Sequence, residues 1–146
     1  MTVLIDTGVV YADHDENATR HSVAENALEV VYDGGLGQPY ISEYVIDESV
    51  TLTMRRGSRD AACRIAEKLA GTGNYPPTFS ILWSTRNTFD TALEIFNRYR
   101  DRTLSFTDAM NIAHVRAQDL DGILSFDDDF DGIVARFDPS DVVASG

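Results

Sequence analysis

The stretch Thr2-Val3-Leu4-Ile5-Asp6-Thr7 decides how this sequence begins to fold. Residues 2–5 form a short apolar run that ends directly at an acid, which is typical of a buried strand. Asp6 is then expected at the carboxyl edge of a sheet. The alternative is an ordinary turn or helix-cap aspartate, because aspartate is common at such positions.

Working outward, short strands and helices alternate along the chain. Further strands are predicted at 38–41, 79–83, 122–126 and, weakly, 134–137. Helices are predicted at 19–32, from the Ser42 N-cap to 56, at 59–69, at 85–99 and from the Thr107 N-cap to 117, with a helix or turn at 9–12. This alternation predicts an α/β fold whose central parallel sheet of about four to five strands has helices on both faces. Ligands of such folds bind beyond the carboxyl ends of the strands.

Composition narrows the class of protein. The chain has 146 residues, so a single domain over 1–146 is expected. Its one cysteine, Cys63, excludes an intramolecular disulfide and argues against a thiolate metal cluster. Apolar runs are shorter than the roughly 18 residues of a transmembrane helix. The first residues lack the features of a signal peptide, so a cytoplasmic location is expected.

The charge balance is strongly acidic. There are 24 Asp and Glu against 12 Lys and Arg, a formal net charge of −12, and Lys68 is the single lysine. This balance argues against a broad basic patch for non-specific phosphate binding. A solvated acidic surface, as in proteins of a salt-rich cytoplasm, explains most of this excess. The positions of individual acids decide whether some have another role.

Three acids stand at unusual positions. Asp6 follows the first predicted strand. Glu48 shares a helix face with Tyr44 and Leu52, where an unpaired carboxylate is costly. It therefore needs a metal, or a partner such as Arg55, Arg56 or another cation. Asp108 lies at a helix start, where it either caps the helix or leans inward, with Ser105 and Thr107 able to orient it.

A run of acids follows the fourth predicted strand. Asp127, Asp128 and Asp129 are consecutive, and Asp131 comes one residue later. Such carboxylates repel one another unless they are solvated or bridged by a cation. For Asp128 and Asp131 a solvated turn is the preferred interpretation. Asp127 occupies the same position after its strand that Asp6 occupies after the first.

Together these acids predict a site for a hard cation. Acids that follow parallel strands converge at one sheet edge, and Mg²⁺ or Mn²⁺ prefers oxygen ligands. A zinc site does not fit, because the three histidines are scattered and His114 is expected to be structural. The glycine-rich phosphate-binding and nucleophile-elbow motifs are absent from the sequence.

The sequence resembles PIN-domain ribonucleases, in particular the VapC-like toxins of toxin–antitoxin pairs. The third of its motifs is the most specific. The matching segments are 3–7 with Tyr11, Ala12 and His21, then 42–48, 104–109 and 123–130. The resemblance implies a three-layer α/β/α fold with strand order 3-2-1-4-5 and metal-dependent cleavage of single-stranded RNA.

Residue by residue, the resemblance implies functional roles for Asp6, Glu48 and Asp108. The fourth acid is Asp127 or Asp129, with Asp127 ranked first because it lies nearest the strand end. These acids would be catalytic, and Asp6, Glu48, Asp108 and Asp127 would bind Mg²⁺ or Mn²⁺. Thr7 and Thr107 match hydroxyl positions that support the acids around the cofactor.

The resemblance also implies partners: an RNA substrate, a cognate antitoxin and a second copy of the chain in a homodimer. Other interpretations remain open at this point. The fold could serve as a catalytically silent interaction or RNA-binding module, a housekeeping RNA-processing nuclease, or a metal-dependent phosphatase or DNA nuclease. A carboxylate–metal cluster does not by itself select RNA over DNA.

Overall fold

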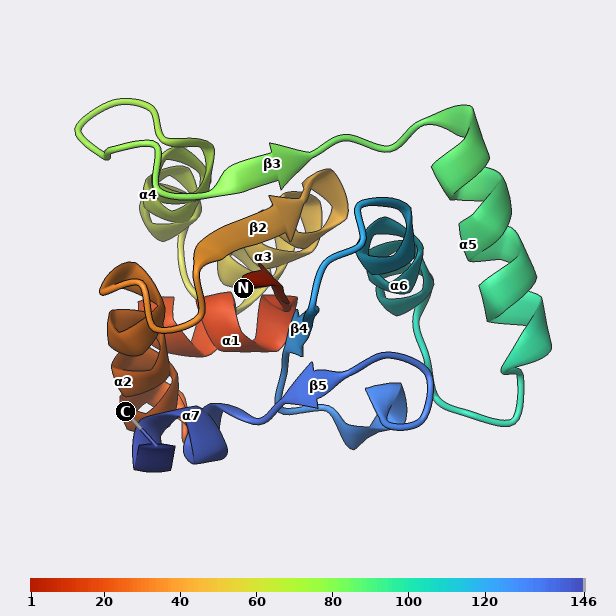
Figure 1. Cartoon of the computed structure of the whole chain (residues 1–146). Helices are drawn as coiled ribbons and strands as arrows, with labels where there is room; N and C mark the ends of the chain where they lie inside the picture. Colours follow the sequence, from red (N-terminus) through yellow and green to blue (C-terminus); the bar gives the residue numbers. More distant parts are fainter. Residues whose placement is uncertain (146) are drawn as a thin grey trace.

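A computed structural model describes residues 1–145 of the chain. Helices and strands alternate along it as the sequence predicts (Figure 1). The elements are β1 (Thr2–Ile5), α1 (Thr7–His14), α2 (His21–Tyr32), β2 (Gln38–Ser42), α3 (Glu43–Arg56), α4 (Arg59–Ala70), β3 (Ser80–Leu82), α5 (Arg86–Arg98), α6 (Phe106–Ala117), β4 (Gly122–Leu124), the 3-10 turn η1 (Asp128–Phe130), β5 (Arg136–Phe137) and α7 (Pro139–Ser145).

The strands form one parallel sheet in the order β3-β2-β1-β4-β5. β1 lies at its centre, with Leu4 beside Tyr40 of β2 and Ile123 of β4. Val3, Leu4 and Ile5 are fully buried, as the unbroken apolar run predicts for a strand covered on both faces. The chain first builds the sheet outward from β1 to β3 and then returns to β4, so strand order reverses beside β1.

Helices cover both faces of the sheet. The helices α1 to α4 form one packed group, in which α1 contacts α2 and α3, and α3 contacts α4. The helices α5 and α6 pack together, while α7 lies against α2 (Figure 1). Because crossovers between parallel strands are right-handed, the outward and returning connections place these two groups on opposite faces. The fold is therefore the predicted three-layer α/β/α arrangement, with the predicted strand order.

The helix that carries Asp108 starts earlier than predicted. Ser105, not Thr107, is its N-cap: the Ser105 hydroxyl accepts from the Asp108 N–H at 3.1 Å. The Asp108 carboxylate in turn accepts from the Ser105 N–H at 2.9 Å. This reciprocal pair satisfies two backbone donors at once, which a Thr107 cap does not offer at this spacing. Thr107 lies in the first turn instead.

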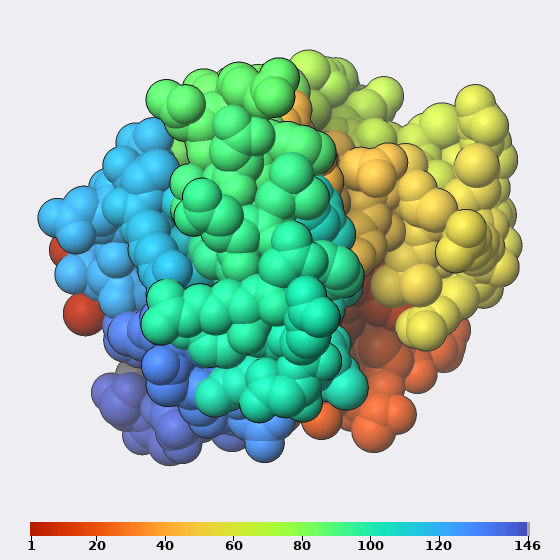
Figure 2. Space-filling view, turned by 90° about the vertical axis from the view of Figure 1, so that its right-hand side faces the viewer, coloured from red at the N-terminus to blue at the C-terminus, as the bar shows by residue number. Residues whose placement is uncertain are grey.

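Other boundaries shift by one to a few residues. β4 ends at Leu124 and β5 covers two residues, because strand length depends on where neighbours pair. Helix α7 was not predicted. Within the described residues, no helix is both long and apolar enough to cross a membrane. In the view of Figure 2, α5 (green) covers much of the middle of the surface, and α3 and α4 (yellow) lie to its right.

Candidate active site

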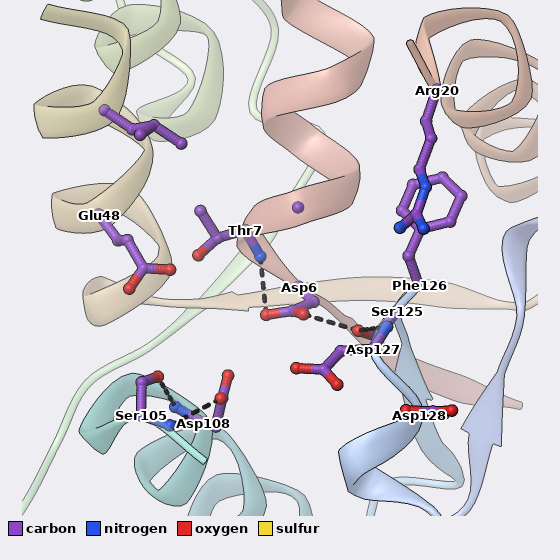
Figure 3. Close-up of a pocket in the computed structure, with 12 residues that line it drawn as sticks. Asp6, Thr7, Arg20, Glu48, Ser105, Asp108, Ser125, Phe126, Asp127 and Asp128 are labelled. Carbon is purple, nitrogen blue, oxygen red and sulfur yellow. Dashed lines mark hydrogen bonds between the residues drawn. The ribbon is translucent and has the colours of Figure 1, made fainter. Parts of the chain in front are cut away.

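A pocket of about 690 Å³ opens beyond the carboxyl ends of β1 and β4, where strand order reverses. Segments from distant parts of the sequence line it (Figure 3). Its walls are Asp6, Thr7, Gly8, Arg20, Glu48, Leu52, Ser105, Asp108, Ser125, Phe126, Asp127 and Asp128. This is the position at which open parallel sheets bind ligands.

Asp6 occupies the floor of the pocket and is its most buried acid, at 7% exposure. It is also the N-cap of α1, since its Oδ1 accepts from the Thr7 N–H at 2.9 Å. Its Oδ2 accepts from the Ser125 hydroxyl at 2.7 Å. Burial and, next, the charge of Asp108 raise the pKa of Asp6 to about 7, although both hydrogen bonds act against that rise. Asp6 does cap α1, but the cap bond is too weak to offset the effect of burial on its pKa.

Asp108 faces Asp6 from the first turn of α6 (Figure 3). Burial is the largest cause that raises the pKa of Asp108 to about 6; its bonds with Ser105 oppose this, and Asp127 and Glu48 add to it. The sequence left capping and an inward-leaning role as alternatives, and the structure shows that Asp108 does both. Two neighbouring carboxyls with raised pKa values mark a place where added positive charge is favourable.

Glu48 extends into the pocket from α3, on the side opposite β4 (Figure 3). It is half-buried, and within residues 1–145 no arginine, lysine or histidine forms an ion pair with it. The predicted alternative of a bond to Arg55 or Arg56 is therefore not observed in the described chain.

The acidic run after β4 separates into distinct environments. Asp127 lines the pocket, and its N–H donates to Ser125 Oγ at 3.0 Å. Its Oδ1 accepts from the Asp129 N–H at 2.9 Å, which starts η1. Asp129 instead accepts from the Thr103 hydroxyl and is not among the described residues that line the pocket. Asp128 lines the rim and is exposed.

The carboxylates of Asp127, Asp128 and Asp129 can each present an oxygen within 4.8 Å of the others. Because Asp129 is held by Thr103, the acid that joins Asp6, Glu48 and Asp108 in the pocket is Asp127.

The two threonines expected to support the acids lie in different places. Thr7 lines the pocket, and its buried Oγ1 has no hydrogen-bond partner among the described residues. Thr107 lines a neighbouring hollow of about 380 Å³ together with Glu48, Leu52 and Arg55. His21, part of the first motif, bonds the Ala12 carbonyl at 2.8 Å and so ties α2 to α1.

Sequence reasoning missed Ser125 and the pair Arg20–Phe126. Ser125 had a detectable signal: it follows Leu124, the register partner of Ile5, and so lies beside Asp6. The Ser125 hydroxyl donates to the Asp6 carboxylate and accepts from the Asp127 N–H, and so links the two acids. The stacking of Arg20 on Phe126 joins residues 106 positions apart, and no local pattern indicates it.

Comparison with family models matches the PIN domain over residues 3–135. A parallel α/β/α fold with an acidic pocket at its switch point, together with a match over most of the chain, shows that this protein belongs to the PIN domain family. Comparison with curated proteins finds no match.

Several solved structures share the fold. VapC20 of Mycobacterium tuberculosis, a toxin that cleaves the sarcin–ricin loop, is 23% identical with a TM-score of 0.75, covering 88% of this chain and 92% of its own. A chain from a Klebsiella pneumoniae toxin–antitoxin complex is 19% identical, with a TM-score of 0.65 and coverage of 94% and 97%. VapBC2 of Rickettsia felis, bound to a DNA fragment from its promoter, is 11% identical, with a TM-score of 0.70 and coverage of 94% and 98%.

Proposed function

We propose that this protein is a metal-dependent endoribonuclease that cleaves single-stranded RNA and acts as a toxin neutralised by a cognate antitoxin. The observation that carries the proposal is the gathering of Asp6, Glu48, Asp108 and Asp127 in one pocket of a PIN domain. The similarity to a toxin that cleaves the sarcin–ricin loop and to a chain of a toxin–antitoxin complex supports the toxin assignment.

The donor set fits Mg²⁺ or Mn²⁺. It consists of carboxylate oxygens, with the unpartnered Thr7 hydroxyl beside them, and hard divalent cations prefer such ligands. Asp6, Glu48, Asp108 and Asp127 would hold the ion. When bound, it would lower the pKa of a coordinated water and offset negative charge on the reacting phosphodiester.

The residues of the chain prepare this site. Ser125 and the Thr7 N–H fix both oxygens of Asp6, and the Ser105 N–H fixes one oxygen of Asp108. Burial raises the pKa of Asp6 to about 7 and that of Asp108 to about 6, so cation binding below these pH values is coupled to proton release. Glu48 completes the site from the opposite wall.

Cleavage of a labelled single-stranded RNA in molar KCl tests this function. We expect cuts with Mn²⁺ or Mg²⁺ and none with EDTA. Asp108→Asn keeps the shape and removes a charge, so the rate should fall at least about a hundredfold, more than loss of a supporting group costs. Cleavage by folded Asp108→Asn at the parental rate would contradict the proposal.

The same assay separates the two candidates for the fourth acid. Asp127→Asn should lose activity and Mn²⁺ affinity. Asp129→Asn is the matched control two residues away, and its Mn²⁺ affinity should stay within a few-fold of the parental value. The opposite result would assign the fourth position to Asp129. A parallel DNA strand of the same sequence tests the preference for RNA.

The remaining assignments are also proposals. An antitoxin should abolish cleavage when added to the purified protein, and its absence from the neighbouring genes would favour a housekeeping nuclease. Sedimentation would show whether the chain forms the proposed homodimer. Absence of both cleavage and Mn²⁺ binding would instead favour a catalytically silent interaction or RNA-binding module. The cytoplasmic location is a separate proposal.

A further inference from the structure

The candidate active site has a charge problem that one residue addresses. Five carboxylates line the pocket, and among the described lining residues Arg20 is the one cation. An RNA strand is a polyanion, so its binding here needs positive charge in addition to that of a bound metal ion. Arg20 is therefore the candidate for a substrate-binding residue, an inference that rests on the proposed nuclease function.

Arg20 is exposed, and its guanidinium lies over the ring of Phe126. Arg20 is the N-cap residue of α2. Its guanidinium carbon lies 4.6 Å from the centre of the Phe126 ring (Figure 3). Phe126 is half-buried directly after β4, next to Asp127. An aromatic face attracts the guanidinium and leaves its N–H groups available to an anion.

The donors of Arg20 are also free of competing partners. Across residues 1–145 no carboxylate lies within 4.0 Å of its guanidinium, and its side chain donates no hydrogen bond. Two arginines nearby differ in this respect. Arg102 donates to the carbonyls of Asp129 and Asp131, and Arg136 pairs with the carboxylates of Asp131 and Asp138.

The position of Arg20 indicates which phosphate it meets. Figure 3 shows Arg20 and Phe126 on the side of the pocket opposite Glu48, with Asp6 and Asp127 between them. The phosphate that is cleaved at the acids would therefore lie to one side of Arg20 and not directly against its guanidinium. We propose that Arg20, oriented by Phe126, binds the phosphate that flanks the scissile one and so orients the RNA strand across the acids.

Binding measurements test this assignment. Affinity for a labelled single-stranded RNA is measured by fluorescence anisotropy with Mn²⁺ over a series of KCl concentrations, in an Asp108→Asn background that does not cleave. Adding Arg20→Gln should weaken binding about tenfold, since a charge-assisted bond of this kind is lost. The slope of log affinity against log salt should shrink by about 0.7, the value for one phosphate of a single strand.

Two further variants separate phosphate binding from other effects. Arg20→Lys should keep the salt slope but lose part of the affinity, because lysine has no planar fork. Arg98→Gln is the matched control: Arg98 also lies over a ring, 5.6 Å from the centre of Tyr99, but outside the pocket. It should change neither affinity nor slope.

In the cleaving protein, Arg20→Gln should raise KM and change kcat less than threefold, because the interaction serves binding in general. If Arg20→Gln leaves affinity, slope and KM unchanged while the parent cleaves RNA, this assignment is overturned and the nuclease function stands. If the parent neither binds nor cleaves RNA, both fail together.

Discussion

The Asp6 carboxylate caps α1 and is buried among other acids, so its two tasks oppose each other. The cap favours a charged oxygen, whereas burial favours the neutral acid. Burial is the larger effect, since the pKa of Asp6 rises to about 7. At neutral pH this residue is therefore poised between protonation states, and added positive charge selects the ionised one.

This residue predicts how stability depends on pH. Between the ordinary pKa near 3.8 and about 7, the folded protein binds more protons at Asp6 than the unfolded chain does. The cation-free protein should then lose stability as pH rises through this interval, and Asp108 adds to the same trend. In EDTA, the Tm of the parent should fall more between pH 5 and pH 8 than the Tm of Asp6→Asn, by roughly 3 °C or more.

Asp101→Asn is the control, because Asp101 is exposed and lies outside the pocket. Its Tm should follow the parental curve. Equal slopes for the parent and Asp6→Asn would show that Asp6 is ionised throughout this range.

At the scale of elements, helix starts place the acids. Ser105 caps α6 and Ser58 caps α4, and each hydroxyl accepts from an N–H three residues on at 3.1 Å. The two hydroxyl bonds are alike, but only the Ser105 cap has a return bond, from the Ser105 N–H to the Asp108 carboxylate, and only Ser105 lines the pocket. They therefore form a matched pair for separating stability from function.

Ser105→Ala and Ser58→Ala should each lower stability by about 1 kcal/mol, the usual cost of a lost N-cap. Ser105→Ala should in addition weaken Mn²⁺ binding about tenfold, because the Asp108 N–H loses its bond to the Ser105 hydroxyl and the turn that positions the Asp108 carboxylate loosens. Urea unfolding and Mn²⁺ titration measure the two effects. Equal losses of Mn²⁺ affinity in both variants would attribute the effect to general destabilisation.

At the scale of the whole molecule, the net charge of −12 is the dominant property. Like charges on a compact chain repel, and salt screens them: the screening length is about 3 Å at 1 M. Most of the acids are solvated surface groups outside the pocket. We therefore expect a protein that folds and works well at high ionic strength.

Thermal unfolding should show Tm rising as KCl increases from about 0.1 M to 1 M, the range over which the screening length shortens from about 10 Å to 3 Å. RNA cleavage should also depend on ionic strength over this range. Sucrose is uncharged, so adding it should not reproduce that dependence. Loss of the folded circular dichroism signal above about 1 M KCl would contradict this expectation.

Local patterns in the sequence determined most of the architecture. The apolar run of Thr2–Ile5, the Ser42 cap and the glycines between helices and strands act over a few residues, so periodicity and capping reveal them. Asp6 directly follows β1 and Asp127 comes three residues after the end of β4, so both lie at the carboxyl edge of the sheet. Their meeting in one pocket is therefore expected without coordinates. Their chemical roles stay predictions.

Tertiary structure alone decided which groups face the pocket. The sequence ranks Asp127 before Asp129 only because Asp127 lies nearer the strand end. In the folded chain Asp129 accepts a hydrogen bond from Thr103, 26 positions away, and Asp127 lines the pocket. Burial, which sets the pKa values of Asp6 and Asp108, depends on all the elements packed around them. Arg20 meets Phe126 because α2 starts beside the end of β4, across 106 positions of chain. Periodicity and caps record neighbours along the chain, whereas these contacts join residues that only the folded packing brings together.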